Sequence, residues 1–249
     1  MSRSPQKKHS LGKKSWGNTV PTSLKGIASR AARDPKCVFR NLSGLLTRDH
    51  FRTSFFKLKK RAAPRVDQVD FEAYRENLEA NIDDLWTRVR QGAYKAKLVR
   101  RKHIPKGGGK TRPLGIPTIE DKLLQLAVRD ILEAIYEEVF LPCSYGYRPN
   151  TGAKDAVRDL SEGIHYGKTN FVVEADIRGF FDNIDHDWMM RMLEEKVDDK
   201  PLLRLIRKWL KAGVLEEDGN IFHPATGTPQ GGIISPLLAN IYLHYVLDL

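Results

Sequence analysis

The chain of 249 residues has few cysteines and no long apolar run. Cys37 and Cys143 stand alone, without the CxxC spacing of a metal site, so we expect a protein of a reducing compartment without a disulfide framework. No apolar run approaches the roughly 18 residues needed to span a membrane. The basic first residues lack the apolar stretch that a secretory signal requires. We therefore expect an intracellular protein that does not enter a membrane.

Acidic residues are almost absent from the first 60 positions, which hold Asp34 and Asp49 against 15 Lys and Arg. The remaining 189 residues hold 27 Lys and Arg against 29 acids, so the formal charge of +11 is an N-terminal feature. Such an arm on a near-neutral body is typical of nucleic-acid binding, and a merely solubilising tail is the alternative. We expect a flexible basic leader at 1–35. The candidate RNA contacts near the end of the basic region are Lys57, Lys59 and Lys60.

Hydrophobic periodicity predicts helices interrupted by hairpins. One or two short helices are expected at 41–60, and one amphipathic helix at 71–92 that Gly92 ends. Two strands joined by KGGGK predict a β-hairpin, and Thr118 is placed to cap a long helix. The further elements expected are a helix from about Thr151, a buried strand at 171–175, helices at 186–197 and 201–212, a hairpin turning at Asp218-Gly219-Asn220, and a helix from Ser235.

The buried strand predicted at 171–175 ends in Asp176. A carboxylate at a strand end points out of the sheet edge, where ligands commonly bind, and oxygen ligands suit Mg²⁺. A loop-capping aspartate is the alternative. Phe180 and Phe181 follow, and one of these rings could lie against a nucleotide sugar, preferably one without a 2′-hydroxyl. Both could instead lie in the core, which we favour for Phe180. We expect Asp182 and Asp185 to cap the next helix rather than to bind metal.

Two glycine-rich segments indicate close contact with a ligand. Lys106 and Lys110 flank the three glycines of the first hairpin, and Arg112 follows, so this tip could fold over a triphosphate. It is not a P-loop, and a solvated hairpin tip is the alternative. In the segment TGTPQGGIISP, proline and glycines impose a tight turn around Gln230, whose amide could reach a base pair.

These segments, in this order, resemble the reverse transcriptase family. The resemblance rests on RPLGIPTIEDKLLQ, SYGYRPNTGAKDAV, EADIRGFFDNIDH and GTPQGGIISPLLANIYLHYVLDL. The preceding VDQVDFEAYRENL and RQGAYKAKLVRRKHIPK resemble the bacterial group II intron branch, whose members act as reverse transcriptase and maturase. The resemblance implies an α+β, right-hand polymerase fold, with a helical N-terminal extension at 36–96, fingers at 97–170 and a partial palm at 171–249.

The resemblance also implies roles for individual residues. Asp176 would be the first metal-binding carboxylate, and Ile177 would present its backbone to the phosphates of the nucleotide. Phe181 would exclude ribonucleotides. The remaining implied contacts are Lys106 and Arg112 with the triphosphate, Gln230 with the nascent base pair or nucleotide sugar, and Arg148 and Asn150 with the template.

The sequence departs from the family pattern in two places. The family's Gly-Val-Asp-Gly-Val stretch reads Arg65-Val66-Asp67-Gln68-Val69 here. The family also places an aromatic-Ala-Asp-Asp hairpin after the last helix, whereas this sequence ends at Leu249. Two-metal transfer uses ions about 3.5 to 4 Å apart. We therefore expect an incomplete two-Mg²⁺ site, and doubt synthesis by this chain alone.

Two functions from different classes follow. The first is an RNA-directed DNA polymerase that uses Mg²⁺, dNTPs, an RNA template and a DNA primer in the bacterial cytoplasm, with intron RNA as its maturase partner. The second is a fragment that binds intron RNA without catalysis. A CRISPR- or defence-associated reverse transcriptase shares the same blocks and stays an alternative. A dimer, or pairing with a complementary C-terminal segment, would cover the exposed edge of the partial palm.

Overall fold

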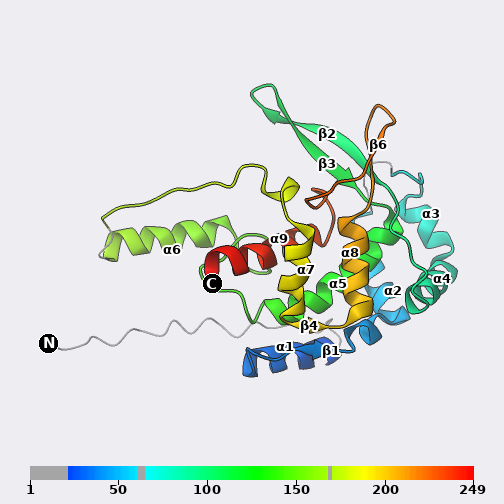
Figure 1. Ribbon diagram of the computed structural model, residues 1–249, viewed down its shortest axis with the longest axis horizontal. Helices are drawn as coiled ribbons and strands as arrows, with labels where there is room; N and C mark the ends of the chain where they lie inside the picture. The colour runs from blue at the N-terminus through cyan, green and yellow to red at the C-terminus, as the bar shows by residue number, and fades with distance from the viewer. Residues whose placement is uncertain (1–21, 61–64, 168–169) are drawn as a thin grey trace.

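Helix α5 (Ile119–Tyr136) forms the axis of the fold (Figure 1). The computed structural model describes residues 22–60, 65–167 and 170–249. As predicted, Thr118 caps α5: its hydroxyl accepts a hydrogen bond from the backbone N–H of Asp121 (3.2 Å). Helix α5 packs against α1 (Thr22–Arg33), α2 (Arg48–Lys57) and α9 (Ser235–Leu243). The fold is therefore built around a helix that the sequence predicted.

The prediction of a flexible leader is wrong for residues 22–33, which form α1. This helix buries Leu24, Ala28 and Ala31 and packs against α5. The apolar residues recur at spacings of four and three, as an amphipathic helix requires, but they are small and lie among many basic residues. The rest of the predicted leader that precedes α1, residues 1–21, lies outside the described residues.

The N-terminal region also joins the body through a short parallel pair of strands. Strand β1 (Phe39–Arg40) pairs with β4 (Val197–Asp198), and the N–H of Phe39 donates to the carbonyl of Lys196 at 2.8 Å. A 3-10 helix (Leu42–Leu45) and α2 follow, as expected for residues 41–60. One hydrophobic core runs from Leu24 to Ile241. The predicted domains thus share a core, and their boundaries stay predictions.

The helix predicted at 71–92 is divided in two, α3 (Phe71–Glu76) and α4 (Leu78–Arg90). Asn77 leaves the helical conformation (φ −118°, ψ 37°). The side-chain amide of Asn81 then donates to the carbonyl of Tyr74 at 2.9 Å. Both helices still bury the predicted apolar face, and Gly92, with φ +72°, follows α4 as expected. The periodicity predicted the buried face but not the break.

Both predicted hairpins belong to one small sheet with the strand order β3-β2-β5-β6. Strands β2 (Val99–Gly107) and β3 (Lys110–Ile116) are antiparallel and project from the body (Figure 1). Strands β5 (Val214–Leu215) and β6 (Ile221–Phe222) form the second hairpin, and β5 pairs in parallel with the base of β2. The sheet therefore joins the hairpin near the N-terminal extension to the C-terminal part of the chain.

The C-terminal half is mainly helical. The predicted helices appear as α6 (Ala153–Tyr166), α7 (His186–Glu194), α8 (Lys200–Leu210) and α9, and a 3-10 turn (Phe180–Asp182) and a π-helical turn (His244–Asp248) complete the chain. None of the helices in the described part of the chain is long and apolar enough to cross a membrane.

The strand predicted at 171–175 does not form. This segment is extended but pairs with no strand among the described residues, and the side chains of Phe171 and Val173 are 86% and 91% exposed. Helix α6, which precedes it, likewise exposes Val157 and Leu160. A β-branched run becomes a strand only where a neighbouring strand supplies hydrogen bonds and other residues bury its side chains. The described residues supply neither to this segment.

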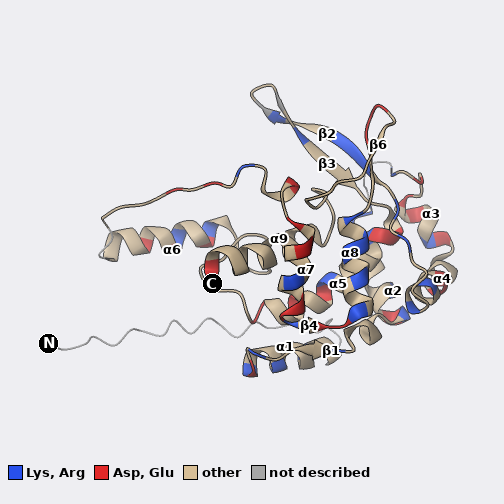
Figure 2. Ribbon diagram, in the orientation of Figure 1, with Lys and Arg blue, Asp and Glu red and all other residues tan. Residues whose placement is uncertain are grey.

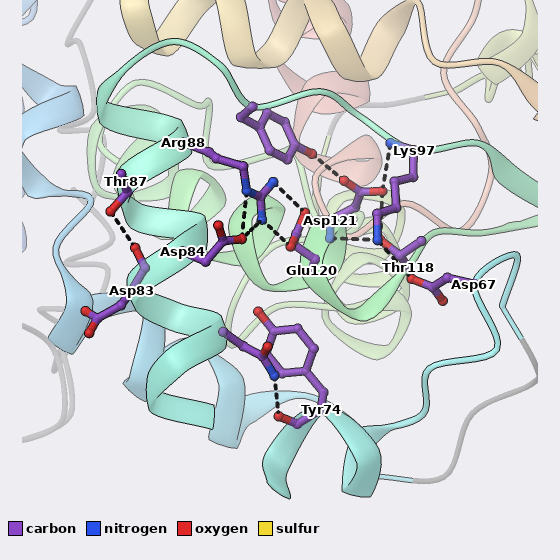
Figure 3. A network of polar contacts seen from close by, with 12 residues as sticks. Asp67, Tyr74, Asp83, Asp84, Thr87, Arg88, Lys97, Thr118, Glu120 and Asp121 are labelled. Carbon is purple, nitrogen blue, oxygen red and sulfur yellow. Dashed lines mark hydrogen bonds and ion pairs between the residues drawn. The ribbon is translucent and has the colours of Figure 1, made fainter. Parts of the chain in front are cut away.

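A buried polar network joins residues 94–97 to α5 (Figure 3), and Trp209 of α8 also contacts it. The hydroxyl of Tyr94 donates to the carboxylate of Asp121 and accepts from the indole N–H of Trp209 at 2.8 Å. Thr118 and the backbone N–H of Lys97 also donate to Asp121, at 2.9 and 3.3 Å. Burial raises the pKa of Asp121 from 3.8 to about 6 despite these donors.

An Asp121→Asn variant should lack part of the pH dependence of stability. Because burial raises its pKa, folded Asp121 binds more protons than unfolded Asp121 between about pH 4 and pH 6, so its contribution to stability falls as pH rises through this range. The upper limit is about 3 kcal/mol. Denaturant unfolding of both proteins from pH 4 to pH 7 measures the difference. A constant difference in unfolding free energy would contradict the expected titration.

Gln68 occupies one of the positions where the family pattern has glycine, and its φ of +55° is left-handed. A Gln68→Gly variant should be more stable by about 1 kcal/mol, because glycine adopts this conformation without a steric penalty. Gln91→Gly is the matched control, since Gln91 has φ −81° and glycine gains nothing there. Chemical denaturation checks both, and equal effects would show that backbone strain at Gln68 is negligible.

Candidate nucleotide-binding site

The loop of residues 226–232, which contains the predicted turn around Gln230, lies against the segment that carries Phe181. The N–H of Gly227 donates to the carbonyl of Ile184 at 2.7 Å, and the N–H of Thr228 donates to that of Phe181 at 2.8 Å. Gly227 has φ +89°, and a Cβ there would lie 2.8 Å from the carbonyl oxygens of Phe181 and Asp182. Only glycine permits this approach, which holds Phe181 beside the loop.

The other side of the loop contacts β3. The N–H of Gly115 donates to the carbonyl of Gln230 at 2.5 Å. Gly231 has φ +112°, and a Cβ there would lie 2.3 Å from the carbonyl oxygen of Gly115. Arg112 stands on the same strand, three residues before Gly115. The loop therefore brings together three predicted features: the Phe181 segment, the Gln230 turn and the basic hairpin.

Buried polar side chains hold the loop in place through hydrogen bonds. Gln125 of α5 accepts a hydrogen bond from the N–H of Ile233 at 2.9 Å, and the ring Nε2–H of His186 donates to the carbonyl of Gly227 at 2.7 Å. The hydroxyls of Thr228 and Ser235 lie 2.8 Å apart. The sequence analysis missed Gln125 and His186 as positioning residues. Gln125 had a detectable signal, because it is a polar residue on the buried face of a long helix.

Phe181 lies at the edge of the core rather than within it. It is partly buried, and its ring is perpendicular to that of Tyr147, with centroids 6.2 Å apart. Phe180 is likewise partly buried and packs against the core beside Tyr242, with ring centroids 6.1 Å apart. Tyr147 is 66% exposed and was not predicted to belong to the site. An accessible aromatic edge is thus available to a ligand at Phe181.

The cations of the hairpin are available to an anion. The side chains of Lys106 and Arg112 are exposed, and neither forms an ion pair or hydrogen bond within the described ranges. Lys106 lies where the register shifts between Pro105 and Gly107, and Arg112 lies opposite Ile104. These positions suit contact with phosphates.

Asp176 and Ile177 lie on the exposed, unpaired segment that leads to Phe181. The carboxylate of Asp176 forms no ion pair with any residue that the structure describes. Among these residues there is also no group of three or more His, Cys, Asp or Glu side chains that could hold a metal ion. Asp185, rather than Asp182, caps α7, accepting from the N–H of Trp188 at 2.8 Å. The described residues thus do not gather a cluster of three or more such ligands around Asp176.

The predicted template contacts are not gathered at the loop. Arg148 is 7% exposed and donates to Glu137 and to the carbonyls of Leu141 and Ser144, at 2.8 and 2.7 Å. Asn150 occupies a turn with φ +59°. On α2 and just beyond it, Lys57 pairs with Asp130 at 2.7 Å, whereas Lys59 and Lys60 are exposed. Arg148 and Lys57 therefore already have partners within the fold.

The chain belongs to the reverse transcriptase family. The family's sequence model, described as reverse transcriptase (RNA-dependent DNA polymerase), matches residues 104–249. The chain is similar to the group II intron-encoded protein LtrA of Lactococcus lactis subsp. cremoris, with 46% identity over 167 residues, 67% of this chain and 27% of LtrA. These findings confirm the resemblance seen in the sequence.

Two further relatives are similar to most of this chain. Protein YkfC of Escherichia coli (strain K12) is 33% identical over 226 residues, covering 88% of this chain and 59% of YkfC. An uncharacterized 91 kDa protein in the cob intron of Schizosaccharomyces pombe is 35% identical over 90% of this chain and 28% of its own length. The chain thus spans 27 to 59% of these relatives.

A solved structure titled "Partial Cas6-RT-Cas1--Cas2 complex" matches with a TM-score of 0.54 and 22% identity, over 83% of this chain and 34% of that one. This likeness concerns the fold alone, and it confirms the predicted α+β reverse transcriptase fold.

Proposed function

We propose that this protein contributes the fingers and part of the palm to an RNA-directed DNA polymerase of the group II intron type, and that it also binds intron RNA. The observation that carries the proposal is the loop of residues 226–232. Its backbone hydrogen bonds connect Phe181 on one side with β3 on the other, through Gln230. A nucleotide held there would meet an aromatic edge, an amide and the hairpin cations. The intron-encoded relatives support the RNA partner.

Each residue has a distinct part in this proposal. Lys106 and Arg112 oppose the charge of the triphosphate, Phe181 lies under the sugar, and Gln230 contacts the base pair. Such a site contributes mainly by positioning the reactants and opposing their charge, because phosphoryl transfer needs little covalent chemistry from the protein. Arg148 supports the template side indirectly, through the turn that it stabilises before Asn150.

Asp176 is the residue that would hold Mg²⁺, with the backbone of Ile177 beside the phosphates. Reverse transcriptases use divalent metals, which stabilise charge on the transferring phosphoryl group when bound. Because the described residues do not gather further ligands around Asp176, we propose that they come from a complementary C-terminal segment or a partner chain. Pairing with that segment would also cover Phe171 and Val173.

A second function, binding of intron RNA without catalysis, is favoured for these 249 residues alone. The unpaired, exposed segment that carries Asp176 supports it, because a carboxylate that its surroundings do not hold in place positions a metal poorly. A CRISPR-associated role draws support from the fold likeness alone, whereas the sequence relatives include intron-encoded proteins. The bacterial relatives also favour a cytoplasmic ribonucleoprotein.

Primer extension on an RNA template tests the first function. In a version of the protein that synthesises DNA, the wild type should extend a DNA primer with dNTPs and reject ribonucleotides. A Phe181→Ala variant of that version should accept ribonucleotides roughly tenfold or more readily, because the ring no longer excludes the 2′-hydroxyl. The ratio of kcat/KM for dNTPs and ribonucleotides is the measurement. Phe180→Ala is the control and should leave the ratio unchanged. Unaltered discrimination in Phe181→Ala would remove this ring from the site, and RNA binding without extension would favour the second function.

A further inference from the structure

A groove of about 840 Å³ lies between α8 and residues 95–98, and it is strongly basic. Figure 2 shows Lys and Arg on successive turns of α8. The groove has an apolar floor of Val66, Ala96, Leu98 and Ala212, and its lining shares no residue with the loop of residues 226–232. Its cationic residues are Lys95, Lys97, Arg204, Arg207, Lys208 and Lys211, with His223 in addition.

The cations of α8 and its C-terminal cap form a single stripe. They lie at positions 204, 207, 208 and 211, a spacing of three, one and three that places them on one face of the helix. The opposite face is buried in the core through Leu202, Leu205, Ile206 and Trp209. The stripe is about 10 Å long, a length in which one strand of a duplex presents about three phosphates.

Some of these cations also have structural roles. Arg207 and Lys208 lie in the last turn of α8, where positive charge is favourable, and Lys208 donates to the carbonyls of Gly92 and Tyr94. Arg207 pairs with Asp187 at 3.1 Å. Lys97 pairs with Asp67, the one acid in the lining, at 3.3 Å (Figure 3). These contacts account for three of the six Lys and Arg residues.

The other three Lys and Arg residues of the groove have no such structural contacts among the described residues. Lys95, Arg204 and Lys211 are exposed, and none forms an ion pair or side-chain hydrogen bond in the described parts of the chain. They line the groove from two segments, Lys95 from residues 95–98 and the other two from α8 and its C-terminal cap. The pKa of Lys208 is lowered by burial and then by the charges of Arg204 and Lys95, which line the same groove.

We propose that this groove binds the phosphodiester backbone of a nucleic-acid helix, at a site separate from the candidate nucleotide site. Cations held together without acidic partners are stabilised when phosphates lie between them. The groove is larger than one phosphate requires, and the stripe matches a run of phosphates rather than a single anion. This inference rests on the RNA binding of the proposed function but not on its polymerase activity, so it can be tested whether or not the protein synthesises DNA.

A triple variant of the 249-residue chain tests the proposal. Lys95→Gln, Arg204→Gln and Lys211→Gln together should weaken binding of a labelled RNA hairpin roughly tenfold or more, and should reduce the slope of log K against log salt by about 2 to 3. Arg75→Gln, Arg90→Gln and Lys154→Gln form the control, because they remove the same charge from exposed positions on α3, α4 and α6. Fluorescence anisotropy over a salt series gives both quantities, and thermal unfolding by circular dichroism confirms that both variants fold.

Three outcomes would overturn the proposal. The first is an unchanged affinity and slope in the groove variant, and the second is an equal loss in both variants. The third is displacement of the RNA by inorganic phosphate when its concentration equals that of the phosphate groups in the RNA. Such displacement would indicate a small-anion site. A DNA hairpin separates the two nucleic acids: a loss for both supports recognition of the backbone alone, and a loss for RNA only supports recognition of the RNA helix.

A second measurement uses the unaltered chain, so it does not rely on variants that fold. Acetylation of lysines followed by mass spectrometry should show that the RNA hairpin protects Lys95 and Lys211 severalfold, whereas Lys154 on α6 stays equally reactive. Equal reactivity of Lys95 and Lys211 with and without RNA would contradict the proposal.

Discussion

An Asp176→Ala variant should lose primer extension by roughly 10³-fold or more in any version of the protein that synthesises DNA. Asp176 is the one proposed metal-binding carboxylate among the described residues, and its side chain is exposed with no ion pair there. Removing it would take away several kcal/mol of charge stabilisation at the transferring phosphoryl group. Single-turnover extension on an RNA template measures the loss.

Glu174→Ala is the matched control for this prediction. Glu174 lies two residues earlier on the same exposed segment, so its substitution removes the same charge. It should leave the rate within about twofold, since an exposed charge away from the chemistry contributes little. A wild-type rate in Asp176→Ala would show that this carboxylate does not bind the metal. Equal losses in the two variants would indicate a general effect of charge on this segment.

A Gly231→Ala variant should lose about 3 kcal/mol or more of unfolding free energy, and should also raise the KM for dNTPs. Two costs add at this position. The φ of +112° is unfavourable for alanine, and its Cβ would lie 2.3 Å from the carbonyl oxygen of Gly115. Because the obstructing atom belongs to the backbone of β3, the loop would have to move away, and Gln230 would move with it.

Gly219→Ala separates the two costs. Gly219 also has a positive φ, +88°, but a Cβ there would meet nothing within 4 Å. This variant should lose only about 1 kcal/mol of unfolding free energy, because only the cost of a positive φ applies to it. Denaturant unfolding compares the two variants, and nucleotide kinetics should change in Gly231→Ala only. Equal losses would mean that the contact with Gly115 relaxes easily, and that the loop does not fix the distance to β3.

Local sequence signals predicted most of the fold around the candidate site. Thr118 followed by acids predicted the start of α5, the glycines of KGGGK predicted a hairpin, and Pro229 with Gly231 predicted a tight turn. In each case the information lies within a few residues, since caps and turns depend on short-range hydrogen bonds. The assembly of these parts depended on long-range bonds, such as that from Gly115 to Gln230, which no local pattern encodes.

Features that depend on distant neighbours could not be predicted in the same way. Residues 171–175 have the composition of a strand, yet remain unpaired because no described strand lies beside them. Arg148 appeared to be a template contact, but Glu137 and two carbonyls already hold its guanidinium. The basic face of α8 was hidden for another reason: acids elsewhere balance its charge, so a count over residues 61–249 shows no excess.

The bond between Gly115 and Gln230 also sets where the β2–β3 hairpin can flex. Its base is anchored on both strands, by this bond on β3 and on β2 by the N–H of Val99, which donates to the carbonyl of Gly213 at 2.8 Å. A hinge at the base would break both anchors. Bending toward a nucleotide would therefore begin beyond Gly115, near the irregular register at Lys106. The tip between Lys106 and Lys110 would then move, while Arg112, which lies opposite Ile104 on the base side of this irregularity, would stay in place with Gln230 and the β5–β6 hairpin.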